Sequence, residues 1–148
     1  MRRALTTLGD ALGPGLAGNL ARTAELARED ADALDAVAAA HLLTLLPGSA
    51  AADPPELELD CSVLAAWVPA VRRRVLLGAL RRAGCPPSAL GRRHVLAVDA
   101  LVSAWRGQGP IHLPAGVVAR RSCGTLVLHR AADADPAVAD RTEHDRQE

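Results

Sequence analysis

Arginine is the residue type in this sequence whose spacing could do chemistry, because it recurs in dense runs that suit phosphate binding. The runs occupy residues 72–74, 81–82, 92–93 and 120–121, and Arg106 stands between the last two. A guanidinium is always charged and presents five N–H donors in a planar fork that matches phosphate oxygens. No nucleophile and base are placed together beside these runs, so the sequence indicates binding and shows no catalytic machinery.

The distribution of charge supports the same interpretation. Residues 1–60 hold 4 arginines and 10 acids, residues 61–130 hold 11 arginines and one acid, and residues 131–148 hold 2 arginines and 6 acids. The net charge of zero therefore hides a block of +10 between acidic ends, which is typical of a polyanion-binding surface. Lysine is absent, as in a GC-rich coding bias, so the number of arginines alone is weak support. An arginine surface paired with the acidic first helix is the alternative.

Several classes of protein find no support in the sequence. Cys61, Cys85 and Cys123 are widely spaced and form no C-x-x-C motif, so neither a zinc site nor a redox pair is expected. No signal peptide and no apolar run of ~18 residues is present, so we expect no membrane span. We expect a reducing, cytoplasmic location.

Two further patterns resemble ligand-binding motifs but have simpler explanations. Gly13, Gly15 and Gly18 match G-x-G-x-x-G, but the preceding residues have helical rather than strand spacing, so we interpret them as a turn and a helix start. The acids of the following helix are typical of a solvated face rather than a metal site. They are Glu25, Glu29, Asp30, Asp32 and Asp35.

The hydrophobic pattern predicts an α+β fold with a small, mostly antiparallel sheet. A short helix at 2–12 and a long helix at 16–46, which could be kinked, form a connector over residues 1–49. Strands at 57–61, 111–113, 117–121 and 125–129 and helices at 68–83 and 89–105 form a domain over residues 56–130, with Asp60 or Ser62 capping a short helix. Residues 131–148 read as a disordered acidic tail.

The helix at 68–83 must position the first two arginine runs. Arg73, Arg74 and Arg81 lie together opposite its apolar face, and Arg82 lies on the flank. Arg72 falls within the apolar face, where a buried charge needs a partner. We therefore assign Arg72 a structural role and expect it to pair with a carboxylate or with carbonyls at a helix end.

The helix at 89–105 carries the next arginines. We expect Trp105 to be buried on its apolar face, together with Leu90, Val98, Leu101 and Val102. Arg92, Asp99 and Arg106 share one stripe, so Asp99 is expected to orient one or more of these arginines. His94, at the apolar edge, is interpreted as packed rather than catalytic.

A family resemblance rests on five segments taken in order. They are ARTAELAREDADALD at 21–35, PAVRRRV at 69–75, VDALVSAWRGQGP at 98–110, LPAGVVARR at 113–121 and GTLVL at 124–128. Together they resemble the part of an actinobacterial tRNA(Ile)-lysidine synthetase that follows its catalytic domain. The resemblance covers residues 2–130, and its strongest element is the stretch from Trp105 through the Leu-Pro-x-Gly turn. Ala115 stands where a second glycine is expected.

The resemblance implies a substrate, cofactors and a missing part. In that family an N-terminal ATP-pyrophosphatase domain uses ATP and Mg²⁺ to adenylate the wobble cytidine of an isoleucine tRNA, and lysine then displaces AMP. Its Ser-Gly-Gly-x-Asp-Ser phosphate loop has no counterpart here, so no catalytic residue can be transferred and this chain is expected to hold no cofactor. The chain would be a truncated product, or its catalytic domain would be a separate polypeptide that serves as a partner.

These arguments give one interpretation and one alternative. The chain is expected to position tRNA rather than to catalyse, with Arg72, Asp99 and Trp105 in structural roles and no metal ligands. The alternative is a non-catalytic protein–protein interaction module whose arginines pair with its own acids. The residues expected to contact RNA phosphate and sugar are Arg73, Arg74, Arg81, Arg82, Arg92, Arg93, Arg106, Arg120 and Arg121.

Overall fold

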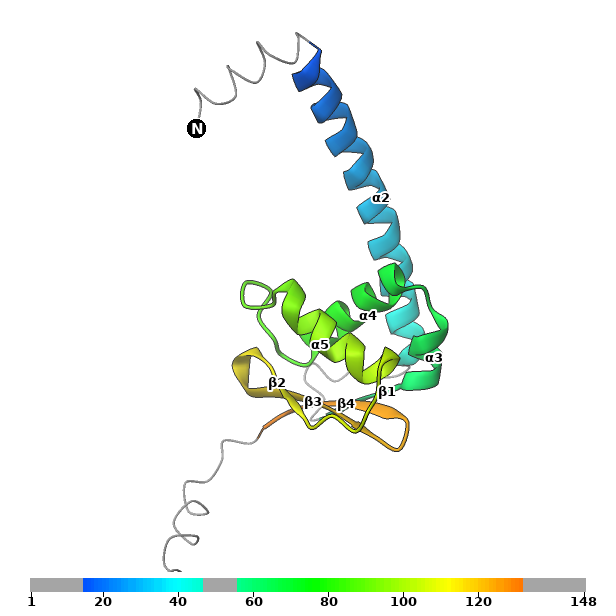
Figure 1. Cartoon of the computed structure of the whole chain (residues 1–148), viewed down its shortest axis with the longest axis vertical. Coiled ribbons are helices and arrows are strands. Elements are labelled where there is room, and N and C mark those ends of the chain that lie inside the picture. The colour runs from blue at the N-terminus through cyan, green and yellow to red at the C-terminus, as the bar shows by residue number, and fades with distance from the viewer. Residues whose placement is uncertain (1–14, 47–55, 132–148) are drawn as a thin grey trace, which may run out of the picture. The chain divides into compact units, whose positions relative to one another are not determined.

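The structure is a computed structural model that describes residues 15–46 and 56–131 (Figure 1). The chain divides into two units, Met1–Val37 and Ala38–Glu148. The expected helix at 2–12, the expected loop at 47–55 and the tail from residue 132 lie outside the described residues. The predicted domain boundaries and their roles stay predictions.

A single helix, α2 (Leu16–Leu45), confirms the long helix expected from the leucine and alanine stripe. It runs for 30 residues without the kink that we considered. Gly15 forms the turn before it, and its carbonyl accepts a hydrogen bond from the Asn19 amide. Gly18 lies inside the helix, which agrees with a helix start rather than a dinucleotide-binding turn.

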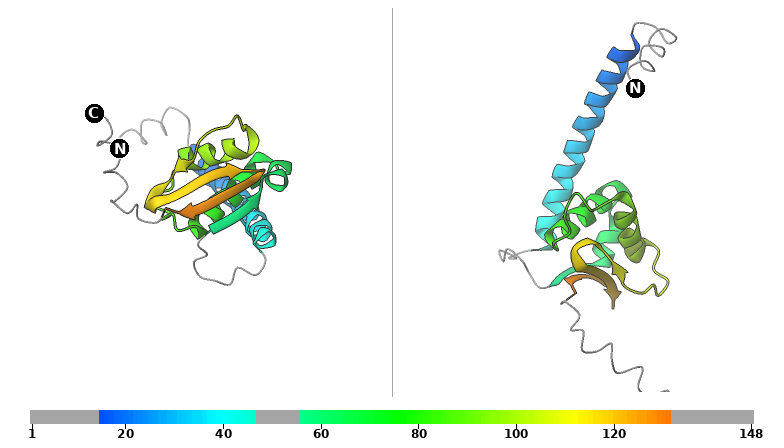
Figure 2. Two further views of the ribbon diagram at one scale, coloured as in Figure 1. Left: turned by 90° about the horizontal axis from the view of Figure 1, so that it is seen from below. Right: turned by 90° about the vertical axis from the view of Figure 1, so that its left-hand side faces the viewer.

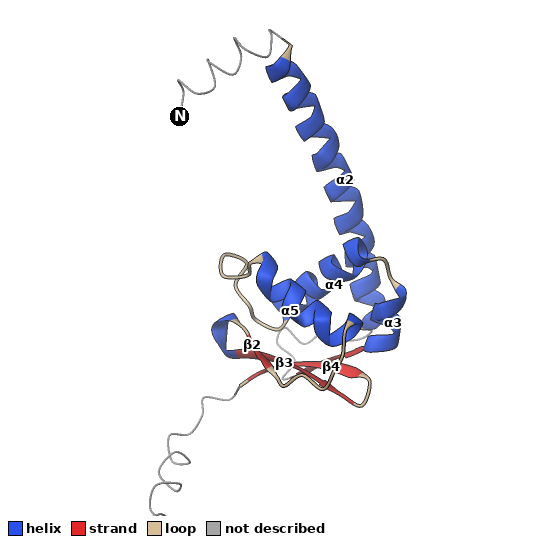
Figure 3. Ribbon diagram, viewed as in Figure 1, coloured by secondary structure: helices blue, strands red, loops and turns tan. Residues whose placement is uncertain are grey.

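Four antiparallel strands form the sheet, in the order β1-β4-β3-β2 (Figure 3). They are β1 (Glu56–Asp60), β2 (Ile111–His112), β3 (Val117–Ser122) and β4 (Thr125–Arg130). Leu57 pairs with Leu128 and Leu59 pairs with Leu126, so all four leucines point to one face and are buried. The alternation of Leu57-Glu-Leu59 predicted this face, and the strand does join the sheet through β4.

The turns of the sheet hold two non-glycine residues in the left-handed region, Ala115 and Cys123. Cys123 (φ 47°) and Gly124 (φ 84°) close the two-residue hairpin between β3 and β4, which confirms the turn expected there. Ala115 (φ 59°) lies in a 3₁₀ turn, Pro114–Gly116, ahead of β3. A left-handed alanine is strained by its Cβ, so the glycine expected at position 115 would fit this backbone better.

Three helices cover one face of the sheet, as the views in Figure 2 show. They are α3 (Cys61–Ala66), α4 (Pro69–Arg82) and α5 (Arg92–Ser103). Asp60 caps α3, because its Oδ1 accepts hydrogen bonds from the amides of Ser62 (2.7 Å) and Val63 (3.4 Å). The core between helices and sheet is built from leucine and valine. Its largest fully buried members include Leu57, Leu59, Leu64, Leu76, Leu80, Leu101, Leu126 and Leu128.

The last turns of α2 belong to the same unit as the sheet and pack on α4. Ala38 is buried, and a Cβ at Gly78 would lie 2.9 Å from Leu42 Cδ2. Glycine at position 78 therefore permits the close approach of the two helices. His41 stacks on Trp67 with the ring centroids 4.4 Å apart.

Helix α5 begins later and ends earlier than the expected 89–105. The amides of Ala89 and Leu90 both donate to the Pro86 carbonyl, which forms a turn before the helix. Gly91 is the N-cap, and its amide donates to His94 Nδ1 at 3.0 Å. His94 was expected to pack at the apolar edge, but it is half-buried and caps the helix instead.

Candidate nucleic-acid interface

Asp99 joins two arginines of the neighbouring helix α4. Its Oδ1 accepts a hydrogen bond from Arg72 Nε at 2.6 Å, and its Oδ2 accepts one from Arg73 Nε at 2.9 Å. Asp99 is 3% exposed and Arg72 is 6% exposed, whereas the Arg73 side chain is 41% exposed. The only acid between residues 61 and 130 is thus hydrogen-bonded to two arginines.

The two arginines keep Asp99 charged. Burial on its own would raise the pKa of Asp99, since it penalises the charged form. The hydrogen bonds and positive charges of Arg72 and Arg73 outweigh burial and hold the pKa below the usual value for an aspartate. The cluster is therefore ionised at neutral pH and carries one net positive charge.

Arg72 also ties α4 to the end of α3. Its NH1 donates to the carbonyl of Trp67, the C-cap residue of α3, at 3.0 Å. Arg72 was expected to pair with a carboxylate or with a helix-end carbonyl. This expectation is confirmed, because Arg72 bonds to both. The expectation that Asp99 orients Arg92 or Arg106 is wrong, because Asp99 faces α4 and both of its oxygens bond there.

Arg121 of β3 caps the C-terminal end of α5. Its NH1 donates to the carbonyls of Leu101 (2.9 Å) and Val102 (3.2 Å). Carbonyls at a helix C-terminus carry partial negative charge, so a guanidinium stabilises this end. The same guanidinium carbon lies 5.5 Å from the centre of the Trp105 ring. No local sequence pattern indicates these contacts, since Arg121 lies 20 residues beyond Leu101.

Trp105 was expected to be buried on α5 and is not. The helix ends at Ser103, and Ala104 leaves the helical region (φ −140°, ψ 45°). Trp105 therefore lies in the loop that follows and is 40% exposed. Gln108, for which no role was expected, shapes this loop: its Nε2 donates to the Ala104 carbonyl at 2.8 Å, and its Oε1 accepts from the Arg106 amide at 2.6 Å.

The other arginines differ in how far they are engaged. Arg120 pairs with Glu56 at 3.2 Å, Arg93 Nε lies 3.3 Å from His94 Nε2, and Arg74 NH1 donates to the Ala70 carbonyl at 3.1 Å. Arg82 is half-buried and also has a partner.

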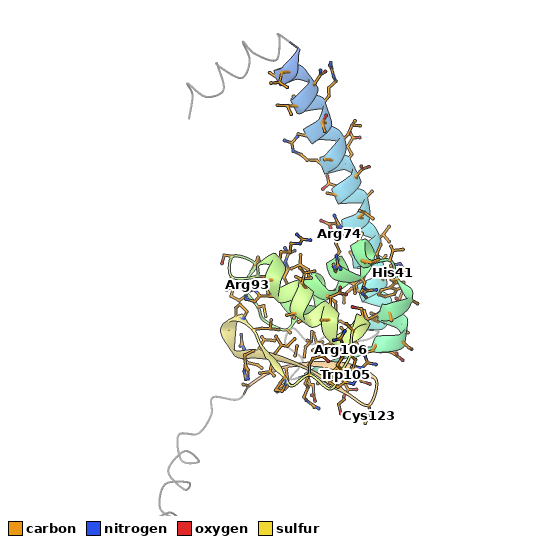
Figure 4. All side chains as sticks on the ribbon, viewed as in Figure 1. His41, Arg74, Arg93, Trp105, Arg106 and Cys123 are labelled. Atoms are coloured by element: carbon orange, nitrogen blue, oxygen red, sulfur yellow. The ribbon has the colours of Figure 1, made fainter. Side chains whose placement is uncertain are left out.

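Three of the arginines predicted to bind RNA are exposed and have no carboxylate partner among the described residues. Arg81, Arg92 and Arg106 are all exposed. Within residues 15–46 and 56–131, none of them has a carboxylate at ion-pair distance. Figure 4 shows Arg93 and Arg106 at opposite ends of α5, so the predicted residues are spread along the module rather than gathered at one point.

A pocket of about 280 Å³ opens between α4 and the start of α5. Its wall is mainly apolar and includes Leu77, Leu90 and Leu96, whereas Arg73 and Arg92 also line it. With Arg74, which also lines it, the pocket brings together three of the predicted RNA-binding residues, from two different helices.

Other kinds of functional site find little support among the described residues. There, no group of three or more His, Cys, Asp or Glu side chains is arranged to hold a metal ion. Cys61 and Cys85 are buried, and burial raises the pKa of both thiols, which suits packing rather than reactivity. No helix among the described residues is long and apolar enough to cross a membrane.

Comparison with known proteins gives a consistent family. The TilS substrate binding domain matches residues 59–127, which include every element from α3 to β3. A tRNA(Ile)-lysidine synthase of Streptomyces coelicolor is 47% identical over 126 residues, which cover 85% of this chain and 34% of that protein. The corresponding proteins of Salinispora tropica and Mycobacterium bovis are 48% and 44% identical, over 82% and 85% of this chain.

The matched region is a limited part of those relatives. This chain spans about a third of the length of the curated proteins that it matches, between 34% and 39% for the three named above. The resemblance noted in the sequence is thereby confirmed. The chain belongs to the tRNA(Ile)-lysidine synthase family, through a region that includes the TilS substrate binding domain.

Proposed function

We propose that this chain binds tRNA and positions it for lysidine synthesis, without carrying out the reaction itself. The observation that carries the proposal is that Arg81, Arg92 and Arg106, on a TilS substrate binding domain, are exposed and have no carboxylate partner within residues 15–46 and 56–131. Phosphate contacts by such arginines give affinity and register while reading little sequence. The substrate would be an isoleucine tRNA, whose wobble cytidine a catalytic domain would modify with ATP, Mg²⁺ and lysine.

Charge complementarity supports this role over the alternative. A self-paired arginine surface requires enough carboxylates nearby, yet Asp99 is the only acid among residues 61–130 and is buried. Arg120 with Glu56 is an exposed pair of the kind that the alternative needs. Exposed pairs contribute little, and Arg81, Arg92 and Arg106 have no carboxylate partner among the described residues, so these three keep their charge available for tRNA.

The test is binding of the whole chain to isoleucine tRNA over a series of salt concentrations. Each phosphate contact releases counterions, so log K should fall linearly with log[salt], and several contacts should weaken binding by orders of magnitude between about 50 and 200 mM salt. Absence of binding at about 50 mM salt, or an affinity that ignores salt, would refute the proposal.

The interaction-module alternative makes a different prediction for one variant. If the arginines serve a protein surface, Arg81→Glu with Arg82→Glu should lower the melting temperature or the binding of a protein partner, and the parent chain should not bind RNA. If they serve tRNA, the same variant should lose tRNA affinity. Thermal melting and tRNA binding measured side by side separate the two.

A further inference from the structure

The two tryptophans are the only aromatic residues of the Phe, Tyr and Trp class in this chain, and the structure uses them differently. Trp67 is half-buried and stacked on His41. Trp105 is 40% exposed, although an indole is among the side chains that gain most from burial. The exposed ring is therefore available to contact a binding partner.

The loop holds the Trp105 backbone in place. The Gln108 side chain bridges the two residues that flank Trp105, through the Ala104 carbonyl (2.8 Å) and the Arg106 amide (2.6 Å). A side chain that bonds to both neighbours limits the motion of the residue between them. A ligand for Trp105 would thus bind a preorganised residue, which reduces the entropy lost on binding.

The charges around Trp105 suit a polyanion. The Arg121 guanidinium lies 5.5 Å from the ring centre and is itself held by the Leu101 and Val102 carbonyls. Arg106, next in the chain, is exposed and has no carboxylate partner among the described residues. A group that stacked on the ring would have two arginines close to its backbone.

The size of the apolar surface argues against a protein partner at this point. The neighbours of Trp105 in the chain, Ser103, Ala104, Arg106 and Gly107, are exposed, and none of them carries a large apolar side chain. A stable protein interface covers roughly 800 Å² on each partner, with a cluster of apolar anchors. A single flat ring flanked by arginines fits the face of one nucleobase, because unpaired RNA bases stack on aromatic rings and guanidinium planes.

We propose that Trp105 is the stacking platform for an unpaired base of the bound RNA, with Arg106 beside it to meet the adjoining phosphate and Arg121 held against the ring. The inference rests on the proposed tRNA-binding function and adds a base contact to it. It requires a nucleotide that is unstacked, as in a loop or at an end, and would not serve a continuous duplex.

The test uses the whole chain with Trp67→Phe, so that Trp105 is the only tryptophan. Titration with isoleucine tRNA should quench its fluorescence in step with binding, whereas a fully paired RNA duplex should bind through the arginines with little quenching. In the parent chain, Trp105→Ala should weaken tRNA binding by about 5- to 100-fold, as loss of one stacked base does, and leave duplex binding unchanged.

Two further variants separate stacking from folding. Trp105→Phe keeps a flat aromatic face and should retain most of the affinity, whereas Trp105→Leu keeps apolar bulk and should lose it. Equal tRNA affinity in the parent, Trp105→Ala and Trp105→Leu chains would overturn the inference while salt-dependent tRNA binding still upheld the proposed function. Absence of tRNA binding by the parent chain would overturn both.

Discussion

Arg72 and Arg81 lie on the same helix, nine positions apart, yet their surroundings have little in common. Arg72 is buried and bonded to Asp99 and to the Trp67 carbonyl, whereas Arg81 is exposed and has no carboxylate partner in the described part of the chain. The contrast extends to two groups: the buried cluster of Arg72, Arg73 and Asp99, and the exposed arginines Arg81, Arg92 and Arg106. The carboxylate of Asp99 on α5 accounts for the difference between Arg72 and Arg81, because it bonds to the first and not to the second.

The comparison shows what a charge count leaves out. The block from 61 to 130 carries +10 by composition, but part of that charge stabilises the fold. Arg72 joins two helices, and Arg121 caps α5 and lies over Trp105. The charge available to a polyanion is therefore better judged from exposed arginines without carboxylates than from the total.

Asp99→Asn should have the largest effect on stability. The substitution removes the negative charge and leaves Arg72 buried without a counter-charge, which typically costs about 3–5 kcal/mol of unfolding free energy. Urea denaturation of the variant and the parent chain measures the difference. A loss of unfolding free energy below about 1 kcal/mol would show that the cluster of Arg72, Arg73 and Asp99 does not stabilise the fold as proposed.

A double variant checks the reason for that loss. Arg72→Met with Asp99→Leu replaces the buried charges with apolar groups, and such replacements are often neutral or stabilising. We expect the double variant to be markedly more stable than Asp99→Asn alone. If it is equally unstable, shape rather than unpaired charge explains the effect.

Acid should weaken the same cluster. The pKa of Asp99 is lowered in the folded protein, so its contribution to stability is complete above the unfolded-state value of about 3.9 and is lost as the pH falls through the folded value. Urea midpoints measured from pH 7 down to pH 3 should fall more steeply for the parent chain than for Asp99→Asn. Asp60, whose hydrogen bonds to Ser62 and Val63 also lower its pKa, acts in the same direction, so Asp60→Asn is the matched control.

Arg120→Gln should have a small effect, because its ion pair is exposed. The Arg120 and Glu56 side chains are 45% and 40% exposed, and pairs of this kind contribute about 0.2–1 kcal/mol. Glu56→Gln should give the same small loss, and the double variant should add nothing further. A loss as large as that of Asp99→Asn would erase the distinction between buried and exposed pairs.

The smallest effect on stability is expected from Arg81→Gln, Arg92→Gln and Arg106→Gln together. These side chains are exposed and have no carboxylate among the described residues, and surface changes of this kind usually stay within about 0.5 kcal/mol each. Thermal melting of the triple variant should therefore match the parent chain. A clear loss of stability would place these arginines with the structural group.

Local pattern explains which parts of the fold were predictable. The stripe of α2, the alternation of β1 and the turn at Cys123–Gly124 depend on residues close in sequence, and each was expected correctly. The need for a partner at Arg72 followed in the same way, because an arginine on an apolar face must be paired when that face is buried.

The contacts of the arginines were missed because they depend on tertiary packing, whereas those of His94 and Gln108 were missed although they are local. The way α4 crosses α5 determines which residue pairs with Arg72. The same crossing brings Arg73 to Asp99. Trp105 was placed on a buried helical face, but Arg121 from β3 takes the carbonyls at the end of α5 and the chain turns away. Neither the crossing nor the cap has a signal within one element.

The central claim is tested most directly by the salt dependence of tRNA binding in the Arg81→Gln, Arg92→Gln, Arg106→Gln variant. Each lost phosphate contact lowers the slope of log K against log[salt] by about 1, so the slope should fall by about 3 from that of the parent chain. A control with Arg22→Gln, Arg28→Gln and Arg141→Gln removes the same charge outside the basic block and should keep the parent slope. An unchanged slope in the first variant, or an equal fall in both, would contradict the claim.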